Sequence, residues 1–405
     1  MTSAVELEVD QLLLEHGEYT PLELLLRSGR LMYADYEAWR DGESRFLDQA
    51  LFGDPDQVLD MLTRAEDYLG RRGWQAETLE YHPWGRQAAA IAKPLRFSAT
   101  EALDARFHRR YRRPDDQPQL DLFTDAPGTV LHNGIVQALE NRDPAESRRL
   151  LERLSDVAPD HPRLGALERL TEALEDLDRP VRDAASELAR LEQTLTPLAE
   201  ALLGSASRHL LTPLWRRLSD ALDGHSYDAA EPRLHLSYTA GRALDWRLVR
   251  EAVQREAGWE REPVLLERYA AACERQHELT QALPAWFAVC WHSPERAEVI
   301  QSSANPVLIE QWEAFQDHEP VLPEAAFPAW LLVQRPALAG VLPEPGADCP
   351  ESYAIVYQLQ RRRATQRRRA TNAPDEDALE LRARLKEQDP LLFAAYMEVL
   401  NARLT

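Results

Sequence analysis

The sequence has few cysteines and no long apolar segment. Only three of its 405 residues are cysteine (Cys273, Cys290 and Cys349), too few for the disulfide framework that stabilises small secreted domains. No run of 18 apolar residues occurs, and the first residues lack the basic region and apolar core of a secretory signal. We therefore expect a cytoplasmic protein that is not associated with a membrane.

Glycine is also scarce, with 16 residues. The sequence contains no phosphate-binding loop, Gly-x-Ser-x-Gly elbow, dinucleotide fingerprint or His-Glu-x-x-His motif. Its 11 histidines are scattered. We therefore predict no catalytic residues and no cofactor, although an enzyme whose site gathers residues from distant positions remains a third hypothesis.

Lysine is almost missing, since only Lys93 and Lys386 occur and arginine carries the remaining positive charge. This bias is typical of proteins from GC-rich bacterial genomes. The net charge of −21 argues against direct nucleic-acid binding by the protein as a whole, because affinity for a duplex comes largely from neutralising phosphates.

Helical spacing of apolar residues dominates the chain, and 44% hydrophobic with 28% charged residues is typical of a folded protein. We predict an all-α protein, either a tetratricopeptide-like helical repeat or a helical bundle. The expected segments are an N-terminal helical domain (1–105), a linker (106–128) that is first basic and then a flexible Pro/Asp-rich loop (114–128), a helical-repeat or bundle domain (129–318), a proline-rich connection (319–350) and a C-terminal helical segment (351–405).

Two short helices are expected near the N-terminus. Thr20 and Pro21 form a cap and first-turn pair that begins a helix ending near Gly29, and residues 31–39 continue with an aromatic face. Two such helices are also typical of a helix-turn-helix. We favour compact helical packing instead, because Asp35 and Glu37 on the second helix would face phosphate.

A helix pair is expected over residues 131–162, with a turn at 141–143 and a proline after the second helix. This stretch resembles a tetratricopeptide repeat, although its small residues fit only loosely. Such pairs normally stack in series, and residues 246–257 and 263–273 are candidates for degenerate copies.

A spacing of three and four residues separates the leucines between positions 167 and 202. Sustained heptads are typical of a coiled coil. Because Pro180 and Pro197 interrupt the run, and an interior proline costs about 3 kcal/mol in a helix, we expect two or three helices of a bundle. Residues 319–350 hold seven prolines and predict an irregular, partly buried connection anchored by Trp330–Val333.

Two arginine clusters are candidates for nucleic-acid contact. The first surrounds Phe107 and Tyr111, and the second lies in the C-terminal segment, where we expect its members to surround a helix axis without forming one stripe. The alternative is that these arginines pair with acidic residues of the same protein. The residues concerned are Arg109, Arg110, Arg112, Arg113, Arg361, Arg362, Arg363, Arg367, Arg368 and Arg369.

Four residues have the side chains that tetrahedral zinc requires. They are Cys273, His277, Cys290 and His292. Because Cys290 lies in the apolar stretch 286–291, we favour a buried, non-ligating thiol, and no metal is predicted.

The segment 113–127 contains Gln119-Leu-Asp-Leu-Phe123 between prolines and aspartates. These neighbours disfavour a helix or a central strand, so three large apolar side chains have no regular element to bury them. The five residues resemble the peptide by which bacterial replication and repair proteins dock on the β sliding clamp, and all five positions match. The eukaryotic clamp peptide is a weaker match, because Thr124 stands where a second aromatic belongs.

The resemblance implies that Leu120, Leu122 and Phe123 fill apolar pockets on the clamp, that Gln119 hydrogen-bonds at the rim and that Asp121 lies between them. The sequence therefore predicts a non-enzymatic adaptor that docks on the clamp in DNA replication or repair and presents its helices to another protein. The alternative is a tetratricopeptide-like scaffold unrelated to DNA, in which 119–123 is a packed loop.

Overall fold

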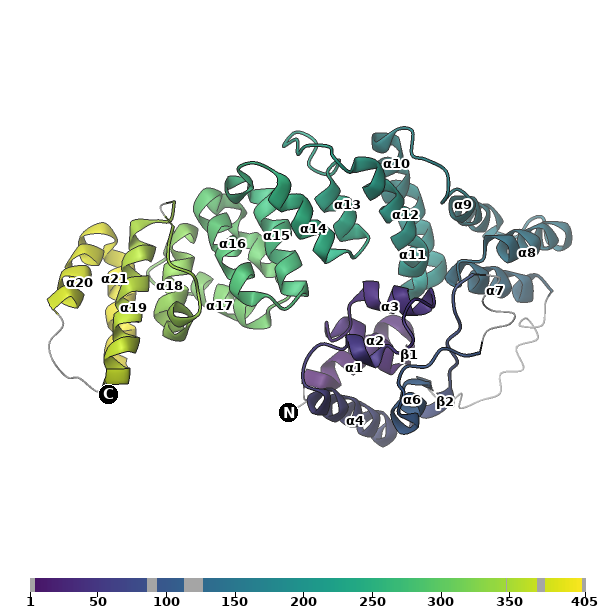
Figure 1. The fold of residues 1–405 in the computed structure, drawn as a ribbon, viewed down its shortest axis with the longest axis horizontal. Coiled ribbons are helices and arrows are strands. Elements are labelled where there is room, and N and C mark those ends of the chain that lie inside the picture. The colour runs from purple at the N-terminus through teal and green to yellow at the C-terminus, as the bar shows by residue number, and fades with distance from the viewer. Residues whose placement is uncertain (1–3, 86–92, 113–126, 347, 370–375, 403–405) are drawn as a thin grey trace. The chain divides into compact units, whose positions relative to one another are not determined.

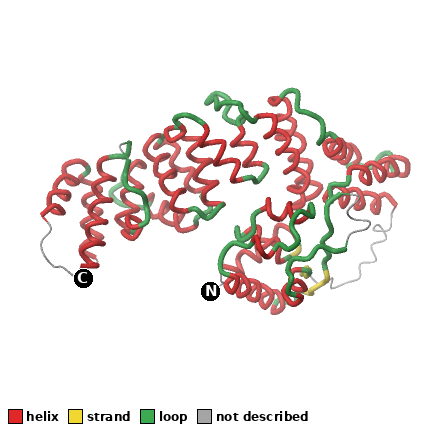
Figure 2. The backbone as a smooth tube through the Cα atoms, viewed as in Figure 1, coloured by secondary structure: helices red, strands yellow, loops and turns green. Residues whose placement is uncertain are grey.

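A computed structural model describes residues 4–85, 93–112, 127–346, 348–369 and 376–402. Helices make up most of this part of the chain, and three short strands form one small sheet near the N-terminus (Figure 2). The predicted all-α fold is confirmed. No helix within the described ranges is long and apolar enough to cross a membrane.

The chain divides into two compact units. The first contains residues 1–225 and 233–245, and the second contains 226–232 and 246–405. This division differs from the expected segments, since the basic linker lies inside the first unit and the boundary between the units falls inside the expected 129–318 domain.

The N-terminal part of the first unit combines helices with the sheet (Figure 1). Two of its helices begin at side-chain caps: the Thr20 side chain accepts from the Glu23 backbone N–H at 3.3 Å, and Asp54 accepts from that of Asp56 at 3.1 Å. The elements are α1 (Ala4–His16), β1 (Glu18–Tyr19), α2 (Pro21–Arg27), α3 (Tyr33–Arg40), η1 (Asp48–Ala50), α4 (Pro55–Arg71), β2 (Gln75–Thr78), α6 (Glu101–Phe107) and β3 (Arg109–Arg112).

Strand β3 is central in the antiparallel sheet, whose order is β1-β3-β2. Tyr111 pairs with Tyr19 on one side and Ala76 on the other. Residues 109–112, expected to belong to a linker, are therefore a strand. Tertiary pairing explains the difference, because Tyr111 alternates inward and packs edge-on against buried Tyr19 at 5.7 Å between ring centroids.

Compact packing of the two short helices agrees with the structure. Helix α3 buries Tyr33, Tyr36 and Trp39 together with the charged residues Glu37 and Arg40. A helix buried over so much of its surface cannot lie in a DNA groove, which argues against the helix-turn-helix alternative.

Helices form the rest of the first unit around a leucine-rich core. The predicted pair is present as α7 and α8. The leucine run is divided between α9 and one continuous helix made of α10, η2 and α11, which agrees with the two or three helices of the bundle interpretation. Pro180 lies between two helices, whereas Pro197 lies inside continuous helical backbone that runs from residue 184 to residue 203 and contains a π-helical turn at Leu191–Leu195, directly before the proline. The elements are α7 (Pro127–Glu140), α8 (Pro144–Val157), α9 (Leu164–Glu175), α10 (Ala184–Arg190), η2 (Leu191–Leu195), α11 (Thr196–Leu203), η3 (Gly204–Ala206), α12 (Ser207–Leu222) and α13 (Leu236–Arg242).

The second unit is a succession of packed helices with its own aromatic-rich core. Its elements are α14 (Trp246–Arg255), η4 (Trp259–Arg261), α15 (Pro263–Arg275), α16 (Leu279–His292), η5 (Pro294–Ser302), α17 (Pro306–Gln316), η6 (Glu324–Ala326), α18 (Phe327–Gln334), η7 (Pro336–Gly340), α19 (Glu351–Arg369), α20 (Glu376–Gln388) and α21 (Pro390–Ala402). The two stretches considered as degenerate repeat copies become α14 and α15, which pack against each other, and α15 packs on α16.

The proline-rich connection is more regular than its composition predicts. Residues 327–334 form α18, and every residue from Phe327 to Val333 is buried. The sequence-based expectation of an irregular segment is therefore wrong here, because Pro328 occupies the first turn of a helix and the apolar run is enclosed by neighbouring helices.

Candidate functional site

The clamp-like motif, Gln119 to Phe123, lies outside the described residues, as does Arg113. The elements on either side are described. Strand β3 ends at Arg112, directly before the segment 113–126, and α7 begins at Pro127, directly after it. Both elements belong to the first unit, so the contacts that hold them in place determine where the two ends of the segment lie.

A buried carboxylate connects the turn after α7 to the N-terminal part. Glu37 in α3 is only 3% exposed. It accepts hydrogen bonds from Arg142 Nη2 at its Oε1 atom and from Arg216 Nη2 at its Oε2 atom, both at 2.5 Å. Arg142 occupies the turn between α7 and α8, and Arg216 belongs to α12. One acid of the N-terminal part therefore binds two elements of the helical part.

Arg142 is held from several sides. Its Nε donates to the His209 carbonyl at 2.7 Å, and its guanidinium lies 3.7 Å from the centroid of the Trp84 ring. The backbone of Arg142 has φ 54, a left-handed conformation that costs a non-glycine residue about 1–2 kcal/mol. The ion pair with Glu37 and the stacking on Trp84 offset this cost.

Arg40 adds a second connection to the same turn. Its Nη2 donates to Asn141 Oδ1 at 3.1 Å, its Nε donates to the His82 carbonyl at 2.9 Å, and its Nη1 donates to Tyr36 Oη at 2.8 Å. The Gly85 backbone N–H donates to the Asn141 carbonyl at 3.1 Å. We call the set Glu37, Arg40, Asn141, Arg142 and Arg216 the α3–turn junction.

His209 lies beside this junction and is buried against three aromatic rings. Trp84 is the nearest, at 5.3 Å between centroids, and Tyr36 and Tyr33 also meet it edge-on. Burial, reinforced by the positive charge of nearby arginines, lowers the pKa of His209 well below its ordinary value of 6.5. The histidine is therefore a neutral packing residue at pH 7.

Sequence reasoning missed the α3–turn junction. Its partners are far apart in the chain, since Glu37 and Arg142 are separated by 105 positions. The sequence indicates the turn 141–143 only as a helix connection and gives Glu37 no partner. No local spacing signals a pair of this kind.

The first arginine cluster is largely engaged within the protein. Arg110 pairs with Glu77 at 2.9 Å, and Arg112 pairs with Glu18 at 2.8 Å, while Arg106 forms two hydrogen bonds with Glu66. Arg109 is exposed. These ion pairs favour the interpretation in which the cluster neutralises acids of its own sheet over one in which it contacts nucleic acid.

The four zinc candidates do not gather. Cys273 and Cys290 are fully buried, and burial raises the pKa of the Cys273 thiol to about 11 and raises that of Cys290 as well, which disfavours the thiolate that zinc requires. Across the described ranges, no three His, Cys, Asp or Glu side chains are grouped in a way that could hold a metal ion.

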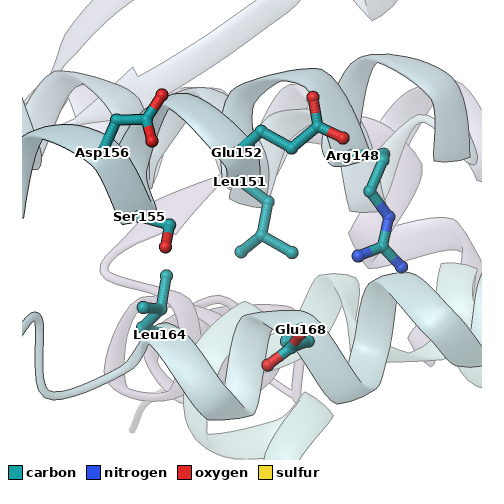
Figure 3. A pocket seen from close by; sticks show the side chains of 7 residues that line it. All are labelled: Arg148, Leu151, Glu152, Ser155, Asp156, Leu164 and Glu168. Carbon is teal, nitrogen blue, oxygen red and sulfur yellow. The ribbon is translucent and has the colours of Figure 1, made fainter. Parts of the chain in front are cut away.

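One hollow of about 260 Å³ lies between α8 and α9. Figure 3 shows Leu151 and Leu164 between the two helices, with Arg148 at one end and Glu168 opposite. Arg148 is already bound to Glu175 through two hydrogen bonds, at 2.8 and 2.7 Å. The lining contains one hydroxyl, that of Ser155, and neither histidine nor cysteine, so it offers no nucleophile with an adjacent base of the ordinary kind.

A second hollow of about 370 Å³ is lined by residues 42–46 and 94–96, and Phe46 is its aromatic residue. The guanidinium of Arg45 lies 5.1 Å from the ring centroid and that of Arg96 lies 5.7 Å away. Arg96 also pairs with Asp104 at 3.1 Å, so the charge of this arginine is compensated.

Comparison with known proteins gives no relative: no family model, no curated protein and no solved structure matches the chain. Proposals on function therefore depend on the residues and contacts described above.

Proposed function

We propose that this protein is a non-enzymatic helical adaptor that docks on the bacterial β sliding clamp through Gln119–Phe123 and offers its helices to a second protein. The observation that carries the proposal is the match of all five residues to the clamp-binding peptide. On docking, burial of Leu120, Leu122 and Phe123 contributes about 1.5–3 kcal/mol for each side chain before ordering costs.

The position of the segment supports this use. It begins after a central strand and ends at a helix of the same unit, and the α3–turn junction binds the far end of that helix to α3. A peptide whose two ends are attached to a folded unit has fewer conformations than a free tail, so it loses less entropy when it binds. We expect micromolar affinity, about −8 kcal/mol.

The test is binding of the full-length protein to purified β clamp by calorimetry, beside the double variant Leu122→Ala/Phe123→Ala. We expect the variant to lose more than about a hundredfold in affinity, since two anchoring side chains are removed. The double variant Thr124→Ala/Asp125→Ala is the matched control and should bind within about threefold of the unchanged protein, because those residues lie outside the motif.

Thermal melting of each variant separates docking from folding. Loss of binding at an unchanged melting temperature supports the proposal. If the unchanged protein does not bind and Leu122→Ala/Phe123→Ala melts several degrees lower, residues 119–123 are a structural staple and the clamp proposal fails. The tetratricopeptide-like scaffold would then be the better description.

A further inference from the structure

The last two turns of α19 differ in charge from the rest of this acidic protein. No Asp or Glu occurs between Ser352 and Pro374, whereas six arginines lie between Arg361 and Arg369, in a chain whose net charge is −21. The structure places all six in one continuous helix, α19. A strong local positive charge is therefore attached to a regular element of the second unit.

One side of α19 is buried in the core of the second unit. Ile355, Val356 and Leu359 belong to that core, and Gln360 is 2% exposed. Gln358, Arg361, Arg362 and Thr365 are exposed. Burial thus defines a solvent side of the helix, and the first two arginines of the cluster lie on it.

Helical periodicity sets which positions farther along α19 share this side of the helix. Arg368 and Arg369 follow Arg361 and Arg362 by seven residues, which is two turns. At about 100° per residue, these four positions fall within an arc of about 120°. Arg363, which is half-buried, and position 367 fall on the other side. Four of the six arginines thus share one side of the helix, and we call Arg361, Arg362, Arg368 and Arg369 the arginine face.

Two acids at or near α19 are already paired with arginines. Glu351, at the start of α19, pairs with Arg384 at 2.6 Å. Asp377 of α20 pairs with Arg362 at 2.7 Å, with both side chains well exposed. Exposed ion pairs contribute only about 0–1 kcal/mol, so a polyanion can displace Asp377 at small cost.

We propose that the arginine face binds the phosphate backbone of nucleic acid without sequence preference. Guanidinium groups bind phosphate through two parallel N–H donors, and the two pairs of arginines lie about 10 Å apart along the helix, a spacing that allows several phosphates to be contacted together. The remainder of the protein is acidic and repels the ligand, so binding is local and strongly dependent on salt. This inference does not depend on clamp docking.

The test is fluorescence anisotropy of the full-length protein with a labelled 20-base-pair DNA duplex and, in separate arms, single-stranded DNA and RNA of the same length. Four phosphate contacts predict a slope of about −3.6 in the logarithm of the association constant against that of salt concentration. Affinity for the duplex should fall by about a hundredfold between 50 and 200 mM salt.

The glutamine variant replaces the whole arginine face: Arg361→Gln/Arg362→Gln/Arg368→Gln/Arg369→Gln. We expect its affinity for the duplex at 50 mM salt to be at least about tenfold weaker, and the dependence of affinity on salt concentration to be less steep. Replacing the same four residues by lysine should keep affinity within about threefold, because the charge is retained. The matched control changes the net charge equally at four exposed arginines elsewhere: Arg153→Gln, Arg169→Gln, Arg182→Gln and Arg335→Gln.

The outcomes separate clearly. The proposal is supported if affinity for nucleic acid falls in the glutamine variant but not in the lysine variant or the matched control. The affinities for duplex DNA, single-stranded DNA and RNA then show which nucleic acid is preferred. The proposal is overturned if no nucleic acid binds at 50 mM salt, if the matched control loses as much affinity as the glutamine variant, or if poly-glutamate binds more tightly than every nucleic acid. Because Gln119–Phe123 is untouched, these results are independent of the clamp experiment.

Discussion

The carboxylate of Glu37 and the guanidinium of Arg142 meet at 2.5 Å across 105 residues of sequence. Glu37 comes from the part of the first unit that carries the sheet, and Arg142 comes from the turn of its first helix pair. Their contact holds the helix that follows the clamp-like segment in a definite position relative to α3. A single buried acid therefore influences how the proposed docking segment is presented.

Replacing Glu37 should destabilise the first unit. In Glu37→Gln, Arg142 and Arg216 lose their anionic partner, and Arg142 stays mostly buried. Removing one member of a buried ion pair leaves an uncompensated charge, so we expect a loss of about 3 kcal/mol in the free energy of unfolding. Urea denaturation measures this loss. The exposed Glu43→Gln is the control and should change stability by less than about 0.5 kcal/mol; a Glu37 variant as stable as the control would contradict the role of the junction.

His209 should make the first unit sensitive to acid. Its pKa is lowered in the folded state, so below pH 6.5 the unfolded chain binds a proton that the folded protein excludes. The contribution of the neutral ring to the free energy of unfolding is therefore fully present above pH 6.5. It declines as the pH falls below 6.5, by up to about 1.4 kcal/mol per pH unit. Urea denaturation between pH 7 and pH 5 measures the slope.

The variant His209→Gln should flatten this pH dependence, because glutamine does not titrate, even if the variant is less stable at pH 7. Exposed His225→Gln is the control and should keep the slope of the unchanged protein. Equal slopes in all three proteins would show that His209 does not exclude the proton.

A buried carboxylate also holds helices of the second unit together. Glu274 in α15 accepts from Trp286 Nε1 at 2.9 Å, from Ser303 Oγ at 2.5 Å and from the Ala304 backbone N–H at 2.7 Å. In Glu274→Ala these buried donors lose their acceptor, so we expect a loss of about 3 kcal/mol. Chemical denaturation followed by tryptophan fluorescence measures it. The exposed Glu298→Ala should stay within about 0.5 kcal/mol of the unchanged protein, and a similar result for Glu274→Ala would refute the prediction.

Gly53 should not tolerate a side chain. Its φ is +103, and a Cβ atom there would lie 2.1 Å from Arg30 Nη1. We expect Gly53→Ala to cost about 1–3 kcal/mol, because the backbone conformation is unfavourable for an L-residue and Arg30 must move. In contrast, Gly70→Ala meets nothing within 4 Å in helix α4 and should add about 0.4–1 kcal/mol. The melting temperatures of the Gly53→Ala and Gly70→Ala variants test this prediction. If both change by the same amount, the positive φ of Gly53 and the contact with Arg30 do not limit that position.

Local features determined much of the helical architecture from the sequence alone. The cap at Thr20, the pair of helices around residues 141–143 and the break near Pro180 depend on short-range spacing and on the backbone limits of proline, so they are visible without a structure. Pro197, in contrast, lies inside a continuous helix that contains a π-helical turn. The sequence also determines part of the arginine face, because helical periodicity sets which arginines share one side of a helix.

Only the tertiary structure decided which side of each element is buried and what distant residues meet. Tyr111 is in a strand because Tyr19 and Ala76 pair with it, α18 is a helix because neighbouring helices enclose its apolar run, and Glu37 is buried because Arg142 and Arg216 reach it. The outward side of α19 is likewise known only from what its other side contacts. These outcomes depend on contacts between residues far apart in the chain, and local propensity carries no information about such contacts.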